Sequence, residues 1–581
     1  MQNNEKQQNI ANSWWTFLEN FQEQNQRMAK TYFDGMQHHT PLPPTLMGDA
    51  FIKAGQALLE NPSYLLKAQE ELMEEVNELW QKMLSAEKGP TTELTRDKRF
   101  RHEAWESVPY FLFIKEYYLI TSRWLQKLVS EVEGLDDKTT HKIQFFTKQL
   151  ADAISPTNFP FTNPEVIEEL VKTQGTSLQK GFETLLEDME SGKWMKMTDP
   201  KAFELGKTLA STPGDVVFRN DLFELIHYRP LTEKQYAIPL LIIPAWINKY
   251  YIFDLSQNNS YIKWMLNKGY NVFIISWVNP KSNNASKTFE DYLVEGIYRA
   301  SDVICSLTQS SSLHTMGYCL GGNLLAALAA YIAKSKASFS LQSMTLLATI
   351  MDFTKIGDLK IFMNEDTLQC MEETMAQKGF LESDTLKSIF SLLKPNELVW
   401  SFFVKNYLLG QIPPAFDFLY WNADSTRVPA NLHSFIIRRC FQENRFMQPG
   451  GINIQGISLD LQEITTPAFL LSTFEDHISP WKSCYPAAHL FKGPLKFVLA
   501  GSGHVAGVIN PPSQNKYYAY TNSHFPINPD DWLENATRTE GSWWTLWDQW
   551  VSPLSGEKTV PLTNYPSLEP APGSYVREIY E

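Results

Sequence analysis

The sequence contains few cysteines for its length. Only five are scattered over 581 residues, and no two of them form a CxxC pair. A disulfide framework needs an even set of cysteines, and structural zinc sites usually need paired ones. We therefore expect neither a disulfide scaffold nor a metal site. One of the five cysteines can instead be chemically active.

Long apolar runs, strongly basic stretches and a secretory leader are also missing. The longest apolar runs, such as 237–247 and 324–333, are shorter than the roughly 20 residues that a membrane-spanning helix needs. The formal net charge of −14 argues against nucleic acid as the main partner. The polar first residues lack the layout of a signal peptide. These absences predict a cytoplasmic, globular protein without a transmembrane segment.

The pattern of apolar residues changes near residue 200, which predicts two domains. Apolar residues recur at helical spacing over 100–128 and 164–195, so we expect residues 1–200 to form a mainly helical N-terminal domain. From about residue 213, short apolar runs alternate with helical stretches, a pattern typical of a parallel sheet covered on both faces. The alternation stops between about 352 and 445. We therefore expect an α/β domain over 201–581 with a cap insertion at about 352–445.

The individual strands and helices of this second domain can be predicted from their apolar patterns. The region 216–228 is expected to be rich in strand, the further expected strands are 239–243, 271–277, 313–318, 344–349, 468–472 and 496–500, and the expected helices are 260–267, 289–306 and 323–333. The helix at 260–267 begins at a serine and ends before Gly269, which are common capping residues.

The segment MGYCLGG, residues 316–322, is the sharpest chemical signal. It has the G-x-S-x-G pattern of a nucleophile elbow, with Cys319 in place of serine. A nucleophile on a tight strand-to-helix turn needs small neighbours, and Gly317 and Gly321 meet that need. A helix N-terminus favours thiolate over thiol, and the backbone N–H of Leu320 would be one oxyanion donor. The pattern predicts an α/β-hydrolase-type, mostly parallel sheet with a cysteine nucleophile.

An elbow of this kind needs an acid and a histidine, in that order along the chain. Asp476 follows the expected strand 468–472, and His504 follows the strand 496–500. Both lie just past strand ends, where α/β sheets place their chemistry. Glu475 is a rival acid from position alone. His477 is either a support for the site or a loop residue, and His314, inside a strand, is expected to be a core histidine.

At this point the sequence resembles the polyhydroxyalkanoate synthases, and its GYCLGG form is similar to the class I, short-chain members. The resemblance covers about residues 95 to 580 and favours Asp476 over Glu475 as the acid. Besides the elbow, it rests on residues 244–255, 272–280, 420–427, 475–478, 503–512, 541–544 and 571–573, and more weakly on 118–123 and 155–159.

The resemblance implies a mechanism and its residues. Cys319, Asp476 and His504 would form a catalytic triad, and the loop at Trp246 and Ile247 would supply the second oxyanion donor. Asp254 and Ser260 match family positions near the substrate. The implied reaction is an acyltransfer that polymerises (R)-3-hydroxyacyl-CoA, 3-hydroxybutyryl-CoA above all, into polyester through an acyl-cysteine. Coenzyme A would be released as part of the substrate, with no separate cofactor.

Partners follow from the same resemblance. It implies a homodimer, growing polyester as a bound product, a place at the surface of cytoplasmic granules, and granule-associated proteins as further partners. The apolar residues between Trp14 and Met28 recur at helix-like spacing. They fit docking to a granule or packing within the protein or its dimer equally well. The tryptophans between 543 and 550 are expected to be core residues.

Two other functions compete with this prediction. A thioesterase, esterase or depolymerase on the same fold would use the same machinery, although serine is the usual nucleophile there. A catalytically silent granule scaffold would use the aromatic N-terminal segment and release no CoA. The complete Cys-Asp-His pattern argues against the scaffold.

Overall fold

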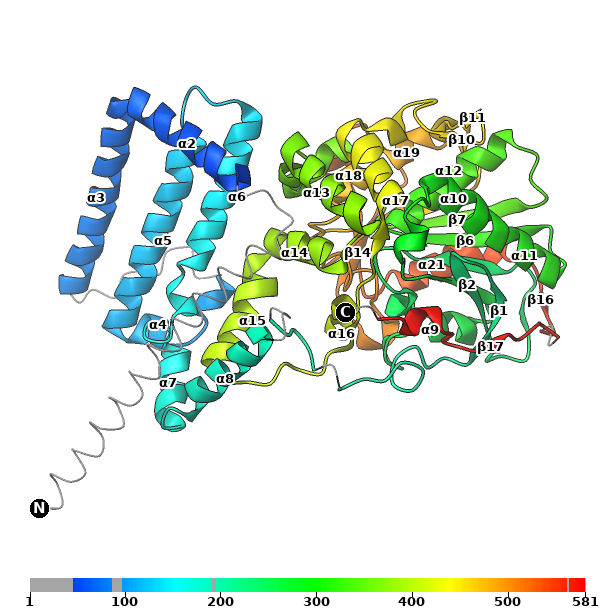
Figure 1. Cartoon of the computed structure of the whole chain (residues 1–581), viewed down its shortest axis with the longest axis horizontal. Coiled ribbons are helices and arrows are strands. Elements are labelled where there is room, and N and C mark those ends of the chain that lie inside the picture. The colour runs from blue at the N-terminus through cyan, green and yellow to red at the C-terminus, as the bar shows by residue number, and fades with distance from the viewer. Residues whose placement is uncertain (1–44, 86–96, 191–194, 200, 562–563, 580–581) are drawn as a thin grey trace, which may run out of the picture. The chain divides into compact units, whose positions relative to one another are not determined.

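The computed structural model describes residues 45–85, 97–190, 195–199, 201–561 and 564–579. These residues divide into two compact units, shown in Figure 1. The helical unit comprises the described residues up to Met197 together with Pro395–Pro413. The sheet unit comprises Thr198–Lys394 and Pro414–Glu581. The apolar segment between Trp14 and Met28 lies outside the described residues.

The helical unit is built from a row of helices with clear start signals. Its helices are α2 (Thr45–Glu60), α3 (Pro62–Ser85), α4 (Ala104–Ser107), α5 (Pro109–Ser130), α6 (Asp137–Ala153), α7 (Pro164–Lys172), α8 (Thr176–Glu190) and α15 (Ser401–Phe403). The side chain of Asp136 caps α6, and that of Asn163 caps α7. α5 packs between α3 and α6 (Figure 1). The expected stretch 100–128 is therefore interrupted, because Pro109 begins a new helix.

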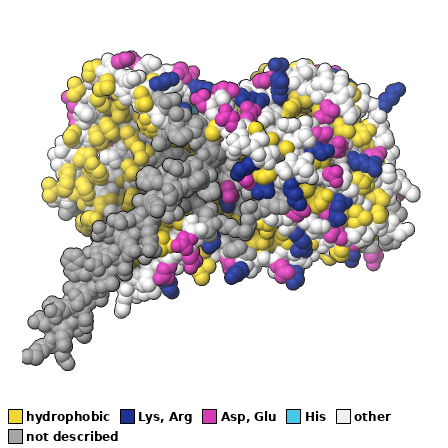
Figure 2. Space-filling model, in the orientation of Figure 1, with side chains coloured by type: hydrophobic (Ala, Val, Ile, Leu, Met, Phe, Trp, Pro, Cys, Tyr) yellow, Lys and Arg dark blue, Asp and Glu magenta, His cyan; other side chains and the backbone are white. Residues whose placement is uncertain are grey.

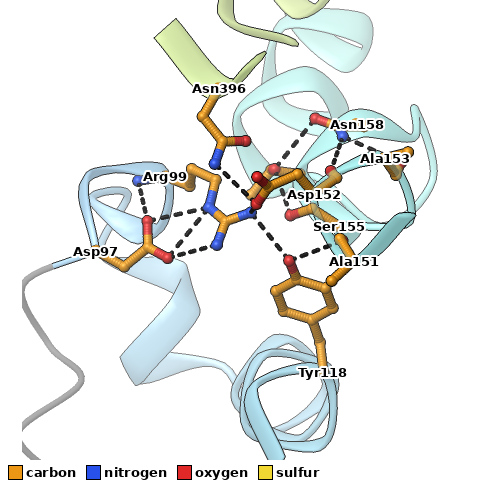
Figure 3. Close-up of polar contacts among 10 residues, drawn as sticks. Asp97, Arg99, Tyr118, Ala151, Asp152, Ala153, Ser155, Asn158 and Asn396 are labelled. Atoms are coloured by element: carbon orange, nitrogen blue, oxygen red, sulfur yellow. Dashed lines mark hydrogen bonds and ion pairs between the residues drawn. The ribbon is translucent and has the colours of Figure 1, made fainter. Parts of the chain in front are cut away.

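A buried polar cluster ties several of these segments together (Figure 3). The Arg99 guanidinium donates to Asp97, to the Tyr118 hydroxyl at 2.9 Å and to Asp152 Oδ1 at 3.1 Å. Burial alone would lower the pKa of Arg99, but the neighbouring Asp97, Tyr118 and Asp152 outweigh it and raise the pKa. Asn396 Nδ2 donates to the same Asp152 oxygen at 2.8 Å. The cluster thus joins residue 396 to helices that lie far earlier in the chain.

A tight turn beside this cluster carries the sequence Ser155–Asn158. Asn158 Nδ2 donates to the carbonyl oxygens of Asp152 and Ala153 at 2.8 and 3.2 Å (Figure 3). The Ser155 and Thr157 hydroxyls are 2.8 Å apart. All of these side chains are buried, so the turn closes the C-terminal end of α6 with its own polar groups.

The segment Pro395–Pro413 is packed against α8. The Tyr407 hydroxyl donates to Asp188 at 2.9 Å, and Asn406 Nδ2 donates to the Lys196 carbonyl at 2.8 Å. A Cβ on Gly181 would lie 2.1 Å from the Tyr407 carbonyl oxygen, so only glycine allows the two backbones to approach this closely. From the sequence, this segment is expected to lie inside the cap at 352–445. A helical pattern does not indicate which unit a helix packs against.

Hydrophobic side chains are exposed on α3 and α5. The exposed members are Leu66, Met73, Trp80 and Leu84 on α3 and Tyr110 and Tyr117 on α5. Figure 2 shows hydrophobic side chains gathered over this part of the helical unit. Exposed apolar patches are typical of interaction surfaces.

The sheet unit is organised around one large sheet. Among the described residues the sheet has eleven strands in the order β15-β14-β13-β12-β7-β6-β4-β5-β2-β1-β17. The strands are β1 (Gly214–Arg219), β2 (Phe223–Tyr228), β4 (Leu240–Ile243), β5 (Val272–Trp277), β6 (Ser312–Tyr318), β7 (Ser340–Leu347), β12 (Ala468–Thr473), β13 (Leu495–Ala500), β14 (Tyr518–Thr521), β15 (Thr537–Glu540) and β17 (Glu569–Pro570). The six central strands, β13 through β5, run parallel, and the outer ones antiparallel. The expected mostly parallel sheet is confirmed.

Pairs of short strands and connecting helices complete the sheet unit. The pairs of short strands are β3 (Gln235–Tyr236) with β16 (Lys558–Thr559), β8 (Phe380–Leu381) with β9 (Val428–Pro429), and β10 (Asn453–Ile454) with β11 (Ile457–Ser458). The helices are α9 (Tyr261–Lys268), α10 (Phe289–Asp291), α11 (Arg299–Thr308), α12 (Leu320–Lys334), α13 (Glu365–Lys378), α14 (Ser383–Leu393), α16 (Asp417–Ala423), α17 (Ala430–Phe435), α18 (Trp481–Cys484), α19 (Ala487–Leu490), α20 (Pro529–Glu534) and α21 (Trp544–Val551). As expected, Ser260 caps α9 and Gly269 ends it with a φ of 87°.

One face of the sheet is covered by α9 and α21. Trp543, Trp544 and Trp547 are almost completely buried and join Leu240 and Ile242 of β4 in the main core. The expectation that these tryptophans are core residues is confirmed. Within the described part of the chain, no helix combines the length and the apolar character needed to cross a membrane.

Candidate active site

Cys319 sits on a strained turn between β6 and α12. Its backbone has φ 53° and ψ −122°, a conformation that costs a residue other than glycine on the order of 1–3 kcal/mol. The neighbouring glycines are sterically required. A Cβ on Gly321 would lie 2.2 Å from the Ile243 carbonyl oxygen, and one on Gly317 would lie 2.6 Å from the Gly322 Cα. This geometry is that of a nucleophile elbow, with its side chain at the carboxyl end of a central strand.

His504 and Asp476 are brought together by two neighbouring strands. β12 and β13 pair in parallel with Thr473 opposite Ala500, so the loops that follow them leave the same edge of the sheet. His504 Nδ1 lies 2.7 Å from Asp476 Oδ2. Cys319, Asp476 and His504 are each less than a tenth exposed, so the arrangement is nearly closed to solvent.

The Asp476 carboxylate is held in place by three further donors. The backbone N–H groups of Ile478 and Ser479 donate to Oδ1 at 2.9 and 2.8 Å, and the Thr473 hydroxyl donates to Oδ2 at 3.1 Å. Such donors are complementary to a negatively charged carboxylate. Glu475, the rival acid from position alone, is exposed. The carboxylate that faces His504 is therefore that of Asp476.

The surroundings of His504 favour its protonated form. Burial lowers the pKa of the imidazole, but the charges of Asp476 and Cys319 and hydrogen bonds to both outweigh burial and raise the pKa. Because Nδ1 faces Asp476, Nε2 is the nitrogen left to bond the Cys319 thiol. The Tyr318 hydroxyl donates to the His504 carbonyl oxygen at 3.2 Å and fixes the backbone there. The three side chains can thus move a proton from sulfur to imidazole.

Two backbone segments that are expected to stabilise an oxyanion begin at the same edge of the sheet. Leu320 is the first residue of α12, and the first N–H groups of a helix have no acceptor within the helix. Ile247 lies in the turn that follows β4, and β4 pairs in parallel with β6 so that Ile243 is opposite Gly317. Both segments therefore leave the same edge of the sheet as Cys319.

Asp254 and Ser260, expected near the substrate, are buried and hydrogen-bonded to each other. Asp254 Oδ1 accepts hydrogen bonds from the hydroxyls of Ser260 and Thr212, both at 2.6 Å, and Oδ2 accepts one from the Thr212 N–H at 3.1 Å. Burial raises the pKa of Asp254, although these hydrogen bonds oppose it. The cluster ties the entry of α9 to the segment before β1.

His477 lies beside the acid and is half-buried. Burial lowers its pKa to about 4, the Asp476 charge opposes this, and the charges of His504 and Lys394 add to it. Its Nε2 has no hydrogen-bond partner among the described residues. A neutral imidazole at this position would leave the proton transfer to His504.

The other four cysteines lack these features. Cys440 and Cys484 are buried, and burial raises the pKa of Cys440 to about 12 and that of Cys484 further. Burial also raises the pKa of the partly exposed Cys305, to about 11. These three thiols stay protonated and unreactive near neutral pH. Over the described ranges, no group of three or more His, Cys, Asp or Glu side chains could hold a metal ion.

Two family models match the sequence. Residues 96–265 match the N-terminal region of poly-beta-hydroxybutyrate polymerase (PhaC), and residues 238–511 match the alpha/beta hydrolase fold. A poly(3-hydroxyalkanoate) polymerase from Methylorubrum extorquens is 42% identical over 90% of this chain and 89% of its own length. The chain belongs to the poly(3-hydroxyalkanoate) polymerase family. The resemblance found in the sequence is thereby confirmed.

Further members of this family match the chain over a similar length. The polymerase subunit PhaC of Rhizobium meliloti (strain 1021) is 42% identical over 92% of this chain and 89% of its own length. That of Cupriavidus necator is 38% identical over 89% of each chain. Among solved structures, a putative hydrolase from Agrobacterium vitis S4 is similar at a TM-score of 0.31 and 12% identity, covering 50% of this chain and 90% of that one. The polymerase family and the α/β-hydrolase fold together identify the chain as an enzyme of polyhydroxyalkanoate synthesis.

Three residues that support the site are not singled out by the sequence. Tyr318 and Thr473 are the last residues of β6 and β12, directly before the elbow and the acid loop. Ser479 contributes only its backbone N–H to Asp476. The position of Tyr318 and Thr473 at strand ends is the sequence signal that could have identified them as site residues. A backbone N–H donor such as that of Ser479 cannot be recognised from residue type.

The remaining buried histidines make the stability of the polymerase depend on pH. Burial lowers the pKa of His227, His314 and His433 to about 4, so they stay neutral in the folded state, whereas the unfolded chain protonates near pH 6.5. The expectation of a core role for His314 is confirmed, since Nδ1 lies 2.7 Å from the Ser343 hydroxyl oxygen. The unfolded state thus binds more protons as the pH falls from about 6.5 towards 4. Stability should fall in that window by up to about 1.4 kcal/mol per pH unit for each histidine.

A leucine at position 433 gives the matched comparison. We expect His433→Leu to make the free energy of unfolding depend less steeply on pH between pH 6.5 and 5. The decrease in slope should correspond to about one proton fewer taken up on unfolding. His504 acts in the opposite sense, because a raised pKa contributes stability that is lost only as the pH rises. Denaturant titrations at several pH values measure the slope, and an identical slope in both proteins would contradict the assignment.

Proposed function

We propose that the polymerase joins (R)-3-hydroxyacyl groups from their CoA thioesters, with 3-hydroxybutyryl-CoA as the substrate, through an acyl group on Cys319. The observation that supports this most is the buried His504–Asp476 pair next to a cysteine on a strained elbow. The enzyme would be an acyltransferase that needs no separate cofactor, because coenzyme A enters and leaves as part of the substrate.

The first half of the proposed cycle loads the enzyme. His504 takes the proton of the Cys319 thiol, and Asp476 stabilises the resulting imidazolium. The thiolate attacks the thioester carbonyl, and the N–H groups of Leu320 and Ile247 would stabilise the oxyanion. When the intermediate collapses, the bond to the CoA sulfur breaks and His504 returns the proton to it. The products are an acyl-cysteine and free CoA.

The second half extends the chain. The 3-hydroxyl of another acyl group loses its proton to His504 and attacks the acyl-cysteine carbonyl. An ester C–O bond forms, the C–S bond breaks, and the proton passes to the Cys319 sulfur. Conversion of a thioester to an oxygen ester is downhill, so growth needs no nucleotide. Because Cys319 is only 8% exposed, the segments that cover it must move to admit substrate, and they exclude water during the reaction.

The identity of the acyl product separates this function from its rival. We expect the wild type to release CoA from (R)-3-hydroxybutyryl-CoA and to leave polyester, measured as thiol released and as polymer recovered by solvent extraction. Free 3-hydroxybutyrate in amounts equal to CoA would make the enzyme a thioesterase instead. No CoA release from this or longer 3-hydroxyacyl-CoA substrates would contradict the polymerisation chemistry.

The proposed function extends to where the enzyme acts. The exposed apolar side chains on α3 and α5 support contact with the polyester at a granule surface, where granule-associated proteins would be neighbours. We also propose a homodimer as the active form, with His477, Asp254 and Ser260 as supports of the substrate region. Light scattering that found only an active monomer would contradict the dimer.

A further inference from the structure

The turn that carries Ile247 is bound to a segment distant in sequence. Residues 421–426 comprise the last three residues of α16 and the first residues after it, within the stretch expected to form the cap. Trp421 Nε1 donates to the Lys249 carbonyl oxygen at 2.7 Å, and the Thr426 hydroxyl donates to the Trp246 carbonyl oxygen at 2.8 Å. Asn248 and Ser425 form an antiparallel bridge between these two bonds. The turn is therefore held along its whole length by this one segment.

The Thr426 bond sets the direction of one particular N–H group. In a trans peptide the C=O and N–H bonds point to opposite sides. The Trp246 carbonyl and the Ile247 N–H belong to the same peptide group, and the carbonyl points to Thr426. The Ile247 N–H must therefore point away from the 421–426 segment. A donor fixed in this way before the reaction is what oxyanion stabilisation requires.

A buried ion pair fixes the same turn from its other end. Lys249 Nζ lies 2.7 Å from Asp424 Oδ1, and the two side chains are only 3% and 13% exposed. The Tyr251 hydroxyl donates to the other oxygen of Asp424 at 2.8 Å. Buried ion pairs add little net stability, but an unpaired buried charge is strongly unfavourable. The pair therefore disfavours any arrangement that separates Lys249 from Asp424.

The elbow lies directly against the start of this turn. Gly321 has no room for a Cβ because the carbonyl oxygens of Ile243 and Pro244 occupy the space. The Pro244 carbonyl is itself held at 2.9 Å by the indole N–H of Trp277. A small shift of the turn would therefore change the distance between its N–H groups and a carbonyl bound at Cys319.

We propose that Asp424 and Thr426 are positioning residues, which hold the Trp246–Ile247 peptide so that its N–H stabilises the oxyanion formed at Cys319. The inference rests on the proposed function, because it assigns a task in the acyl-transfer step. Neither side chain needs to touch the substrate. Both act through the turn, and loss of either lowers the rate of acyl transfer while the nucleophile itself stays intact.

The test compares turnover with a reaction of Cys319 that needs no oxyanion hole. Thr426→Val removes the hydroxyl at nearly constant shape, Thr426→Ser keeps it, and Asp424→Asn keeps an acceptor for Tyr251 but removes the charge. We expect Thr426→Val and Asp424→Asn to lower kcat for CoA release by about 10- to 100-fold at a KM changed less than about threefold. Thr426→Ser should restore most of the rate.

Alkylation by iodoacetamide supplies the reference reaction. Displacement at its saturated carbon forms no oxyanion, so the rate at which Cys319 is alkylated, followed by peptide mass spectrometry, should stay within about twofold of wild type. Glu224→Gln is the control for a lost buried charge, since Glu224 is paired with Arg219 outside the turn. This control should lower stability and leave kcat unchanged.

Each result has one meaning. Lower kcat with normal alkylation and rescue by serine supports the positioning role. Alkylation that falls in step with kcat, an unchanged kcat, or a serine variant as slow as the valine variant would overturn it. If the wild type alkylates at Cys319 but releases no CoA, the proposed function fails and this inference fails with it.

Discussion

Replacing Cys319 with alanine should abolish polymer formation, with CoA release reduced by about 10³-fold or more. The reason is that Cys319 is the thiol that lies beside His504. Among the remaining cysteines, burial raises the pKa of Cys305, Cys440 and Cys484 and keeps these thiols protonated. Because the alanine side chain is smaller and Cys319 is buried at the elbow, the fold should tolerate this change.

A serine substitution at position 319 tests the chemistry of the nucleophile while keeping nearly the same side-chain shape. Cys319→Ser should retain the elbow and bind substrate, yet turn over at least about 10²-fold more slowly, since a hydroxyl is harder to ionise than a thiol and forms a less reactive acyl group. Cys305→Ser, a change on α11, is the control and should have wild-type activity. The measurement is CoA release under identical conditions, with acyl attachment followed by mass spectrometry. Polymer formation by the alanine variant would overturn the assignment of the nucleophile.

Replacing Asp476 with asparagine should lower kcat by about 10² to 10⁴-fold, because an amide cannot stabilise the imidazolium and can force the wrong tautomer of His504. The 2.7 Å contact between the two side chains makes this dependence direct. The pKa of His504 should also fall, since Asp476 is the main group that raises it. We therefore expect the acidic limb of the pH–rate profile to shift to lower pH.

The residue next to Asp476 provides a matched control. Glu475→Gln makes the same chemical change one position away, on an exposed side chain. This variant should keep kcat within about twofold of wild type. Equal losses in the two variants would show that the loop, and not the Asp476 carboxylate, is what the reaction needs.

The parts of the site that sequence patterns predicted are those with local causes. The elbow follows from the spacing of Gly317, Cys319 and Gly321, and the structure gives each glycine a steric reason. Asp476 and His504 follow from strand ends in a parallel sheet, where β12 and β13 bring successive loops to one edge. Local periodicity also placed most central strands to within a few residues.

The parts that sequence patterns did not predict depend on distant partners. β14 and β15 form an antiparallel edge from two short runs, of which β14 is partly buried and β15 is exposed, so they carry little apolar signal. The expected strand 344–349 begins earlier, at Ser340, because its pairing with β6 extends into polar residues. The partners of Asp254 and of Lys249 lie at Thr212 and Asp424, and nothing in the spacing of these residues points to either contact.

The packing of Pro395–Pro413 on α8 makes the helical unit discontinuous in sequence. The polypeptide therefore passes between the units three times, after Met197, after Lys394 and after Pro413. A protease that cut at the first crossing would detach residues 1–197 from the rest of the chain, but Pro395–Pro413 would stay covalently attached to the sheet unit. A recombinant fragment ending at residue 197 would lack Tyr407 and Asn396, and with them one hydrogen-bond partner each of Asp188 and Asp152. Excising the sheet unit cleanly thus calls for a direct link between residues 394 and 414, and excising the helical unit calls for one between residues 197 and 395. Any comparison of full-length and truncated enzymes has to meet these requirements.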